Sequence, residues 1–219
     1  MMNSVKNNLF IIRQIPYQDN TVICHVFSDD DEIIPVFYRL PKVRKSGILQ
    51  PFQRFSTQLK KSTGNMYKMY NIQSQDAFYL TGYPLIAGLY INELMDKFIY
   101  DAGTVEGSFN LYYQTLQQLK SKPLPVVVRG FELGLLTLIG YGIDTSYPDE
   151  YFIHVEQERW LINCENSPLQ VKDVKSIMCG EISEARAQAC GPLIRKMLQI
   201  LIPGGSISSL DLIKHNIAN

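Results

Sequence analysis

Short runs of β-branched and aromatic residues alternate with polar or glycine-containing breaks over the first 75 residues of the chain. This pattern predicts strands, because Ile, Val, Phe, Tyr and Thr favour the pleated backbone whereas Asp, Asn, Gly and Pro favour turns. The predicted strands cover residues 9–15, 21–28, 33–40, 52–61 and 66–73, and the breaks at 29–31, 41–47 and 62–65 are predicted turns and loops. Five strands of this length are typical of an OB-fold, a partly open barrel that binds oligonucleotides.

Hydrophobic residues recur at helical spacing after residue 82, so the second part of the chain is predicted to be mainly α-helical. The predicted helices cover residues 84–100, 109–120 and 126–139. The third is apolar on nearly every face, which is typical of a helix at the centre of a core. It also contains Gly134, which costs about 1 kcal/mol of helix propensity relative to alanine, and this favours a close contact with another helix.

The last third of the chain alternates again before a final helical segment. Residues 151–163 are predicted to form a small β-hairpin, and residues 181–201 a helix that Gly191 and Pro192 could interrupt. Ser208 and Asp211 resemble a capping box for a last short helix. Together the patterns predict an α+β protein, with a five-stranded OB-fold barrel in residues 1–80 and a mainly α-helical domain with a small β-hairpin in residues 81–219.

A chain of 219 residues with 46% hydrophobic residues can bury one or two cores. No stretch approaches the ~18 apolar residues of a membrane span, and the N-terminal segment lacks the features of a signal peptide, so a cytoplasmic protein that avoids membranes is expected. The four cysteines, Cys24, Cys164, Cys179 and Cys190, form no C-x-x-C pair. We therefore expect ordinary buried thiols rather than disulfides or a zinc site.

The formal net charge is zero, but the charges are unevenly distributed. Residues 1–80 hold ten Lys and Arg against six Asp and Glu, whereas residues 81–219 hold eleven against fifteen. From Arg39 to Gln75 the chain has eight basic residues, no acidic residue and several aromatic ones. Such a segment can attract phosphates and offer flat rings to unstacked bases, which favours single-stranded nucleic acid as a ligand. A strand face that merely carries Lys and Arg to solvent would have the same composition, and both interpretations remain open.

The basic residues of this segment are the candidate phosphate contacts, above all those at the end of the third predicted strand and in the loop after it. The candidate DNA-binding residues are Arg39, Lys42, Arg44, Lys45, Arg54, Lys60, Lys61, Tyr38 and Phe52. Tyr38 and Phe52 are either core residues or rings that stack on bases, and the sequence leaves these two roles open.

Residues for catalysis are not grouped in the sequence. His25, His154 and His215 lie in three different predicted elements, without acidic or cysteine residues at ligand spacing. The strings G-x-S-x-G, H-E-x-x-H and G-x-x-x-x-G-K-[ST] are missing, so hydrolase, metalloprotease and P-loop ATPase chemistry lack their required residues. We therefore expect a protein that is not an enzyme and has no metal and no cofactor.

Three strings of residues are informative in combination. Leu49-Gln50-Pro51-Phe52 follows the basic loop, Gly88-Leu89-Tyr90-Ile91-Asn92-Glu93-Leu94-Met95 lies in the first predicted helix, and Arg129-x-Phe131-Glu132-Leu133-x-Leu135-Leu136 precedes Ile139-Gly140-Tyr141-Gly142. In this order the strings resemble the RecO family of bacterial recombination mediators and DNA repair proteins. The resemblance extends over nearly the whole chain, from the region of Tyr17 to Gly205.

The resemblance implies an N-terminal OB-fold and a C-terminal helical domain, as the hydrophobic pattern does. It also implies a protein that binds single- and double-stranded DNA, anneals complementary strands and partners RecR. Such a protein helps to load RecA onto DNA coated by the single-stranded DNA-binding protein, SSB, without covalent chemistry. It would act in the cytoplasm in association with the nucleoid.

The family also recognises the acidic C-terminal tail of SSB, which ends in phenylalanine, through its helical domain. The arginine two positions before Phe-Glu-Leu lies in or near that docking pocket, and here it is Arg129. A guanidinium group suits a terminal carboxylate, and Leu133 could contact the aromatic ring. Arg129 could instead form a structural ion pair with Glu132 one turn along the helix, and the sequence does not separate these roles.

The chain departs from the family pattern in three places, the first of which is the basic loop, where members often have Gly and Arg and this chain has Leu40-Pro41-Lys42-Val43-Arg44-Lys45. Many members carry four cysteines after the Gly-Tyr-Gly string, whereas residues 143–150 contain none, which implies a zinc-free member. Gly204 and Gly205 are not followed by the usual Lys-Ser-Arg run, so a DNA contact there is not implied. The alternative function is a protein-interaction adaptor whose OB-fold binds nucleic acid weakly or not at all.

Overall fold

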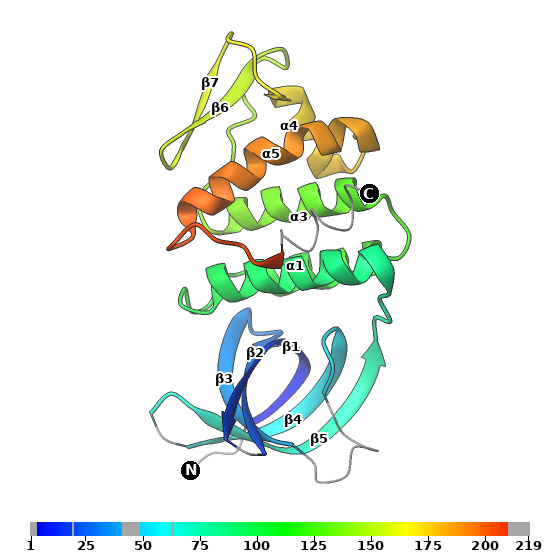
Figure 1. Cartoon of the computed structure of the whole chain (residues 1–219), viewed down its shortest axis with the longest axis vertical. Coiled ribbons are helices and arrows are strands. Elements are labelled where there is room, and N and C mark those ends of the chain that lie inside the picture. Colours follow the sequence, from blue (N-terminus) through cyan, green and yellow to red (C-terminus); the bar gives the residue numbers. More distant parts are fainter. Residues whose placement is uncertain (1–3, 19, 41–48, 63, 210–219) are drawn as a thin grey trace. The chain divides into compact units, whose positions relative to one another are not determined.

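The computed structural model describes residues 4–18, 20–40, 49–62 and 64–209 (Figure 1). The chain divides into two compact units. The first contains Met1–Leu80 and Asn92–Asn110, and the second contains Thr81–Ile91 and Leu111–Asn219. The structure therefore groups Asn92–Asn110 with the strands at the start of the chain, through contacts between residues distant in sequence.

Five strands of the first unit close into a barrel in the order β1-β2-β3-β5-β4 (Figure 1). They are β1 (Ser4–Gln18), β2 (Thr21–Ser28), β3 (Glu32–Arg39), β4 (Gln53–Lys61) and β5 (Tyr67–Ala77). Neighbouring strands are antiparallel except β3 and β5, which run parallel and pair Val36 with Tyr67 and Phe37 with Lys68. The predicted five-stranded barrel is confirmed, although β1 begins five residues earlier than predicted, at Ser4.

Alternation along the strands fills the barrel with apolar side chains. In β4, Phe55, Thr57 and Leu59 are buried, and the residues between them are more exposed. The same inward positions of β2 and β3 hold buried residues such as Val26 and Val36. Because full burial of a large apolar side chain contributes about 1.5–3 kcal/mol, this alternation fixes which face of each strand points inward.

Polar contacts hold Asn92–Asn110 against the strands of the first unit. The Asp31 carboxylate accepts hydrogen bonds from the backbone N–H groups of Gly107 (3.0 Å) and Phe109 (2.7 Å). The Asn92 side chain donates to the carbonyl of Ile12 (3.2 Å). A carboxylate at the first turn of a helix satisfies N–H groups that have no partner within the helix, so Asp31 caps the helix that begins at Ser108.

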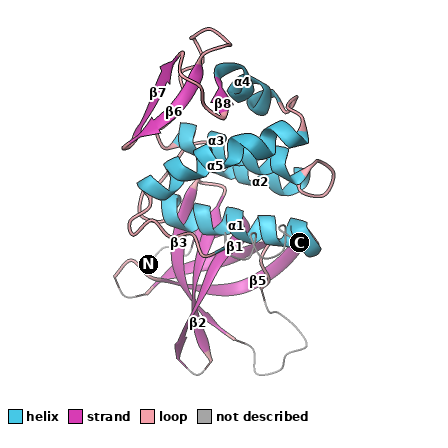
Figure 2. Ribbon diagram, turned by 45° about the horizontal axis from the view of Figure 1, so that its top comes forward, coloured by secondary structure: helices cyan, strands magenta, loops and turns pink. Residues whose placement is uncertain are grey.

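The rest of the chain is mainly helical, with a small sheet (Figure 2). The helices are α1 (Gly82–Ile99), α2 (Ser108–Gln118), α3 (Leu124–Leu138), α4 (Val171–Cys179) and α5 (Glu184–Leu201). The sheet has the order β7-β6-β8 and consists of β6 (Phe152–Glu156), β7 (Arg159–Asn163) and β8 (Leu169–Gln170). The predicted α+β class, the hairpin, and the helices predicted over residues 84–100, 109–120, 126–139 and 181–201 are confirmed. Among the described residues, no helix is long and apolar enough to cross a membrane.

Helix α3 is the central helix of the second unit, as its sequence predicts. Its buried residues include Val126, Val127 and Val128, and because consecutive helical residues are about 100° apart, these three point in different directions around the helix axis. A Cβ atom built on Gly134 would lie 2.8 Å from Cδ1 of Leu111 in α2. The close helix contact that the glycine indicated is therefore present, and any larger residue would have to displace Leu111.

The C-terminal segment differs from the prediction in three respects. Helix α5 continues through Pro192 instead of breaking there, and it begins after Ser183, whose Oγ accepts the backbone N–H of Arg186 (3.3 Å). Strand β8 and helix α4 were not predicted, because two strand residues and nine helical residues give a weak periodic signal. Asp211 and the predicted last helix lie outside the described residues.

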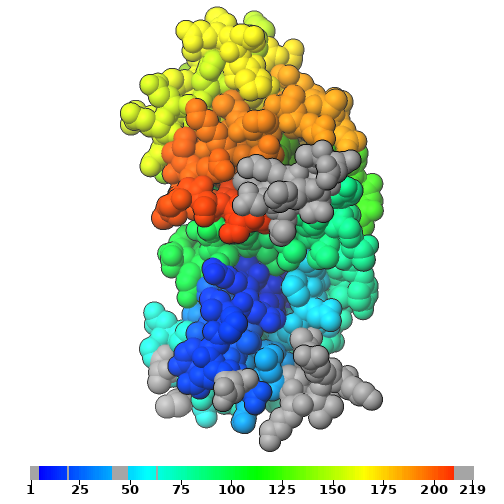
Figure 3. All heavy atoms as spheres, viewed as in Figure 1, coloured from blue at the N-terminus to red at the C-terminus, as the bar shows by residue number. Residues whose placement is uncertain are grey.

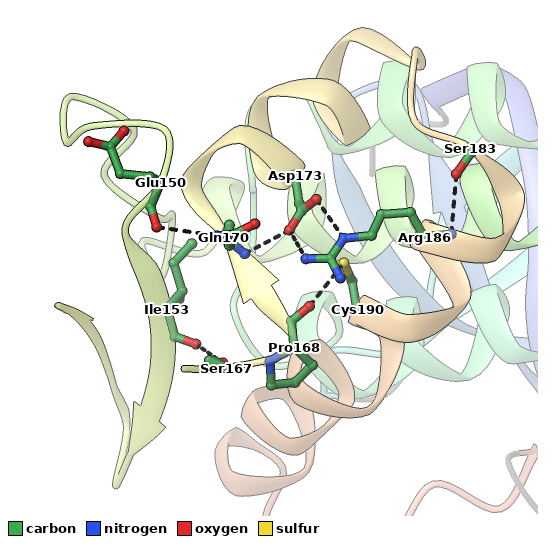
Figure 4. A network of polar contacts seen from close by, with 9 residues as sticks. All are labelled: Glu150, Ile153, Ser167, Pro168, Gln170, Asp173, Ser183, Arg186 and Cys190. Carbon is green, nitrogen blue, oxygen red and sulfur yellow. Dashed lines mark hydrogen bonds and ion pairs between the residues drawn. The ribbon is translucent and has the colours of Figure 1, made fainter. Parts of the chain in front are cut away.

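A polar network joins α4 and α5 to the small sheet (Figure 4). The Arg186 guanidinium donates to both carboxylate oxygens of Asp173, from Nε to Oδ1 (2.8 Å) and from Nη2 to Oδ2 (2.5 Å). The second of these oxygens also accepts the backbone N–H of Gln170 (2.8 Å) in the capping box of α4. A bidentate pair of this kind fixes geometry as well as charge, so the network is structural.

Candidate nucleic-acid interface

One outer face of the barrel carries exposed basic and aromatic side chains on β3, β5 and β4. Lys68 of β5 is the register partner of Phe37 in β3 on one side and of Lys60 in β4 on the other. Tyr70, two residues after Lys68, points to the same face and is 46% exposed. Arg39 ends β3 and is exposed. We call these five residues, Phe37, Arg39, Lys60, Lys68 and Tyr70, the β3-β5-β4 face.

The local sequence explains why these residues point outward. Tyr67 and Met69 of β5 pack against the barrel core, so the residues between and after them, Lys68 and Tyr70, face solvent. Asn71 then adopts a φ of 54°, and the register shifts before the partly buried Ile72 also packs against the core. The bulge lets the strand change which of its residues point inward.

The structure divides the basic residues that the sequence selected into three groups. Arg39, Lys60 and Lys61 are exposed at neighbouring strand ends, together with Lys68, which was not selected. Arg54 lies elsewhere on β4, where Nε pairs with Asp76 Oδ1 (2.6 Å) and its charge is compensated. The three loop residues, Lys42, Arg44 and Lys45, lie outside the described residues, so their role stays a prediction.

The two aromatic candidates are core residues, which decides between the roles that the sequence left open. Tyr38 is 6% exposed and Phe52 is 2% exposed. Tyr38 packs in the barrel core, and burial raises its pKa. Neither ring is accessible to a base in this conformation. The exposed rings of the barrel are instead Tyr17 and Tyr70, at 52% and 46% exposure. The alternation within β5 was the sequence signal that could have identified Tyr70.

Arg129 forms the ion pair with Glu132 that the sequence offered as one of its two roles. Arg129 Nη2 lies 2.8 Å from Glu132 Oε1, and the Tyr90 hydroxyl donates to the same oxygen (2.6 Å). Arg129 is 5% exposed and Glu132 is fully buried. Leu133 is also buried, at 3% exposure. Neither predicted tail-binding residue therefore presents its side chain at the surface of the described protein.

The pair belongs to a cluster with more positive than negative charge. The pKa of Glu132 lies above its ordinary value, because the effect of burial outweighs the charges of Arg129 and Arg195 and the hydrogen bond from Tyr90, which act to lower it. Burial and the charge of Arg129 lower the pKa of Arg195. Within the described residues, Arg129 Nε and Nη1 and Glu132 Oε2 have no hydrogen-bond partner. Gly191 leaves room for the guanidinium, since a Cβ atom there would overlap Arg129 Nη1.

The cysteines correct one expectation from the sequence. Cys24 and Cys190 are buried, and burial raises their pKa values to about 12 and about 11. Cys164 and Cys179 are exposed, so the expectation of four buried thiols is wrong for these two. In the part of the chain that the structure describes, no three His, Cys, Asp or Glu residues are arranged to hold a metal ion.

The fold and the exposed basic face define an OB-fold protein with an attached helical unit. The sequence matches the family model for the Recombination protein O C terminal over residues 81–147. DNA repair protein RecO of Vibrio cholerae is 25% identical over 94% of this chain and 92% of its own length. DNA repair protein RecO of Aliivibrio salmonicida is 27% identical over 73% of each chain, and that of Pectobacterium atrosepticum is 30% identical over 62% of this chain and 57% of its own. The chain is therefore similar to RecO proteins over most of its length, and its residues 81–147 match the model of their C-terminal part.

Proposed function

We propose that this protein is a non-enzymatic DNA repair and recombination mediator that binds and anneals DNA. In this proposal it acts with RecR to load RecA onto SSB-coated DNA, at the nucleoid in the cytoplasm. The family relationship supports the repair role, because the relatives are named DNA repair proteins. The observation that carries the DNA-binding role is the grouping of Arg39, Lys60, Lys61 and Lys68 at neighbouring strand ends of an OB-type barrel.

The chemistry of these side chains suits binding without sequence preference. Lysine and arginine neutralise phosphates and release counterions, and these contacts carry no information about base sequence. The same neutralisation favours annealing, because two complementary strands repel each other less when cations screen their phosphates. Lys6 does not add to this surface, because it pairs with Asp30 and Glu32.

Salt dependence tests the DNA-binding role. If Arg39, Lys60, Lys61 and Lys68 each contact one phosphate, log K for a labelled single strand should fall against log[salt] with a slope near −3, since each neutralised phosphate contributes about −0.7. The variant Lys60→Ala with Lys61→Ala should bind more weakly and with a slope shallower by about 1.4. Fluorescence anisotropy at several salt concentrations measures both quantities.

A control variant with the same change in charge shows whether the position of the lysines matters. Lys172→Ala with Lys175→Ala removes two exposed lysines from α4 of the second unit and should leave affinity and slope unchanged. Equal losses in the two double variants would mean that only net charge matters. A wild-type protein that binds no DNA at low salt would favour the adaptor function instead.

The SSB tail is proposed to bind at the helical unit near Arg129. The support is the excess of positive charge in the cluster of Arg129, Arg195 and Glu132, together with guanidinium N–H groups that lack partners in the described protein. An acidic peptide with a terminal carboxylate is the complementary ligand. Because Arg129 is buried, the tail would have to reach it by displacing a covering side chain or by competing with Glu132.

We expect loss of Arg129 to abolish binding of an SSB tail peptide while DNA affinity stays unchanged. Arg129→Ala alone would leave Glu132 buried without its counter-ion, so the informative variant is Arg129→Met with Glu132→Leu, which removes both charges. Isothermal titration of the peptide and anisotropy with DNA measure the two affinities. Unchanged peptide affinity in the folded double variant would remove Arg129 from the site.

A further inference from the structure

Phe37 of the β3-β5-β4 face forms a pair of aromatic rings with Tyr17, which is not part of that face. The Tyr17 ring, near the end of β1, packs against Phe37 with ring centroids 5.3 Å apart and an angle of 48° between the planes. Tyr17 is 52% exposed and Phe37 is partly exposed. Exposed rings that support each other keep a fixed orientation, so they present a stable flat surface to a ligand.

The strand register brings cationic groups next to these rings. Phe37 is the register partner of Lys68, and Lys68 is the register partner of Lys60. Because adjacent strands lie about 4.8 Å apart, this row of one aromatic ring and two cationic side chains extends over roughly 10 Å of surface. None of the residues in this row (Phe37, Lys68 and Lys60) is acidic, and neither are its described neighbours Arg39 and Tyr70.

The position of this row within the barrel is the position of the ligand face in OB-folds. Such barrels bind oligonucleotides over their second and third strands and at the turns that follow the first and fourth strands. Phe37 lies in β3, Tyr17 precedes the turn from β1 to β2, and Lys60 and Lys68 flank the turn from β4 to β5. The exposed rings, the cations and the fold therefore indicate the same surface.

We propose that Tyr17, supported by Phe37, stacks on a base of single-stranded DNA whose phosphates Lys68 and Lys60 bind. The proposal rests on the DNA-binding function proposed above and adds a preference for single strands. Lysines contact the phosphates of single and double strands alike, whereas a ring can stack only on a base whose face is free. Bases inside a duplex are already stacked on their neighbours, so Tyr17 contributes to binding of the single strand alone.

The test combines protein variants with altered ligands, using the full chain. The ligands are a labelled oligo-dT, a backbone of the same length made of abasic sites, and a duplex of that length. We expect Tyr17→Ala to weaken oligo-dT binding at least ~5-fold and to leave binding of the abasic backbone and the duplex within ~2-fold of wild type. Tyr17→Phe, which keeps the ring, should bind all three as wild type does.

Two further variants separate stacking from charge and from unspecific loss of a ring. Lys68→Ala should weaken all three ligands and make the salt slope for oligo-dT shallower by about 0.7. Tyr79→Ala removes a ring that is 82% exposed beyond the other end of β5, and it should change nothing. Circular dichroism of each variant shows whether it is folded, and Tyr70→Ala provides a second test of ring loss on the same face.

The outcomes distinguish the proposed stacking of a base on Tyr17 from the DNA-binding function on which it rests. Suppose that wild type binds DNA and that Tyr17→Ala binds oligo-dT equally well, or loses affinity for oligo-dT and for the abasic backbone to the same extent. The proposed stacking on Tyr17 is then wrong, and the DNA-binding function stands. If wild type binds none of the three ligands at low salt, both proposals fail. If Tyr17→Ala loses affinity for oligo-dT alone and Tyr17→Phe binds it as wild type does, the proposed stacking is supported.

Discussion

Replacement of Glu132 by alanine is expected to lower the free energy of unfolding by about 3–5 kcal/mol, the usual cost of breaking a buried ion pair from one side. The carboxylate is fully buried, it compensates Arg129 at 2.8 Å, and it accepts the Tyr90 hydroxyl. Without it, the guanidinium stays buried with no counter-ion and the hydroxyl loses its acceptor. Urea unfolding followed by the fluorescence of the single tryptophan, Trp160, measures the change.

Two variants show whether the buried charge causes this loss. Arg129→Met with Glu132→Leu should be more stable than Glu132→Ala, although it carries two substitutions, because it leaves no buried charge without a partner. Lys97→Ala breaks the partly exposed pair with Glu93, 3.9 Å apart, and should cost only about 0.5 kcal/mol. A double variant less stable than Glu132→Ala would mean that packing rather than charge dominates the site.

Asp96 is expected to be the main polar link between α1 and the barrel strands within the first unit. Its carboxylate pairs with Arg13 Nη1 (2.8 Å) and with His25 Nδ1, and its side chain is 8% exposed. Tyr100 stacks on the His25 ring with centroids 3.9 Å apart. Asp96→Asn should therefore lower the free energy of unfolding by about 2 kcal/mol at pH 7, because it removes a charge with two hydrogen-bonded partners. Urea unfolding followed by far-UV circular dichroism measures it.

The effect of Asp96→Asn should depend on pH. Burial acts to raise the pKa of Asp96, but the hydrogen bonds and charges of His25 and Arg13 outweigh it, so the pKa lies below its ordinary value. A carboxyl group whose pKa is lower in the folded state contributes its full stabilisation above the unfolded pKa, which is about 3.9. That contribution is lost as the pH falls through the lower, folded pKa. The difference between wild type and variant should therefore shrink in acid.

A control and an opposing outcome define this prediction. Asp101→Asn changes an exposed residue of the same unit and should alter stability by less than about 0.5 kcal/mol at any pH. A difference between wild type and Asp96→Asn that is the same at pH 7 and well below pH 3 would show that Asp96 stabilises the protein by its shape and not by its charge.

The sequence predicted much of the fold because each element has a periodic hydrophobic pattern of its own. The alternation of 52–61 identified β4 nearly to the residue, and the apolar run of 126–139 identified α3 as the central helix. Gly134 indicated a close helix contact before its partner, Leu111, was known. Weaker patterns failed: α4 has nine residues and β8 has two, and neither was predicted.

The sequence located the candidate binding segment but not its surface. A run without acidic residues from Arg39 to Gln75 marked the region, and Lys60 and Lys61 proved exposed. Arg54 was selected with them, yet it pairs with Asp76, a residue just beyond that run. Lys68 and Tyr70 were left out of the candidate set, although the register places Lys68 beside both Phe37 and Lys60.

The sequence by itself determined the α+β class, the order of the elements and the unequal distribution of charge, because these depend on local propensity and on composition. Only the tertiary structure decided which aromatic residues are available to a ligand and which cations are compensated. Tyr38 and Phe52 are buried while Tyr17 and Tyr70 are exposed, and Arg129 is paired with Glu132. Burial depends on strand register and barrel closure, and charge compensation depends on the partners that folding supplies.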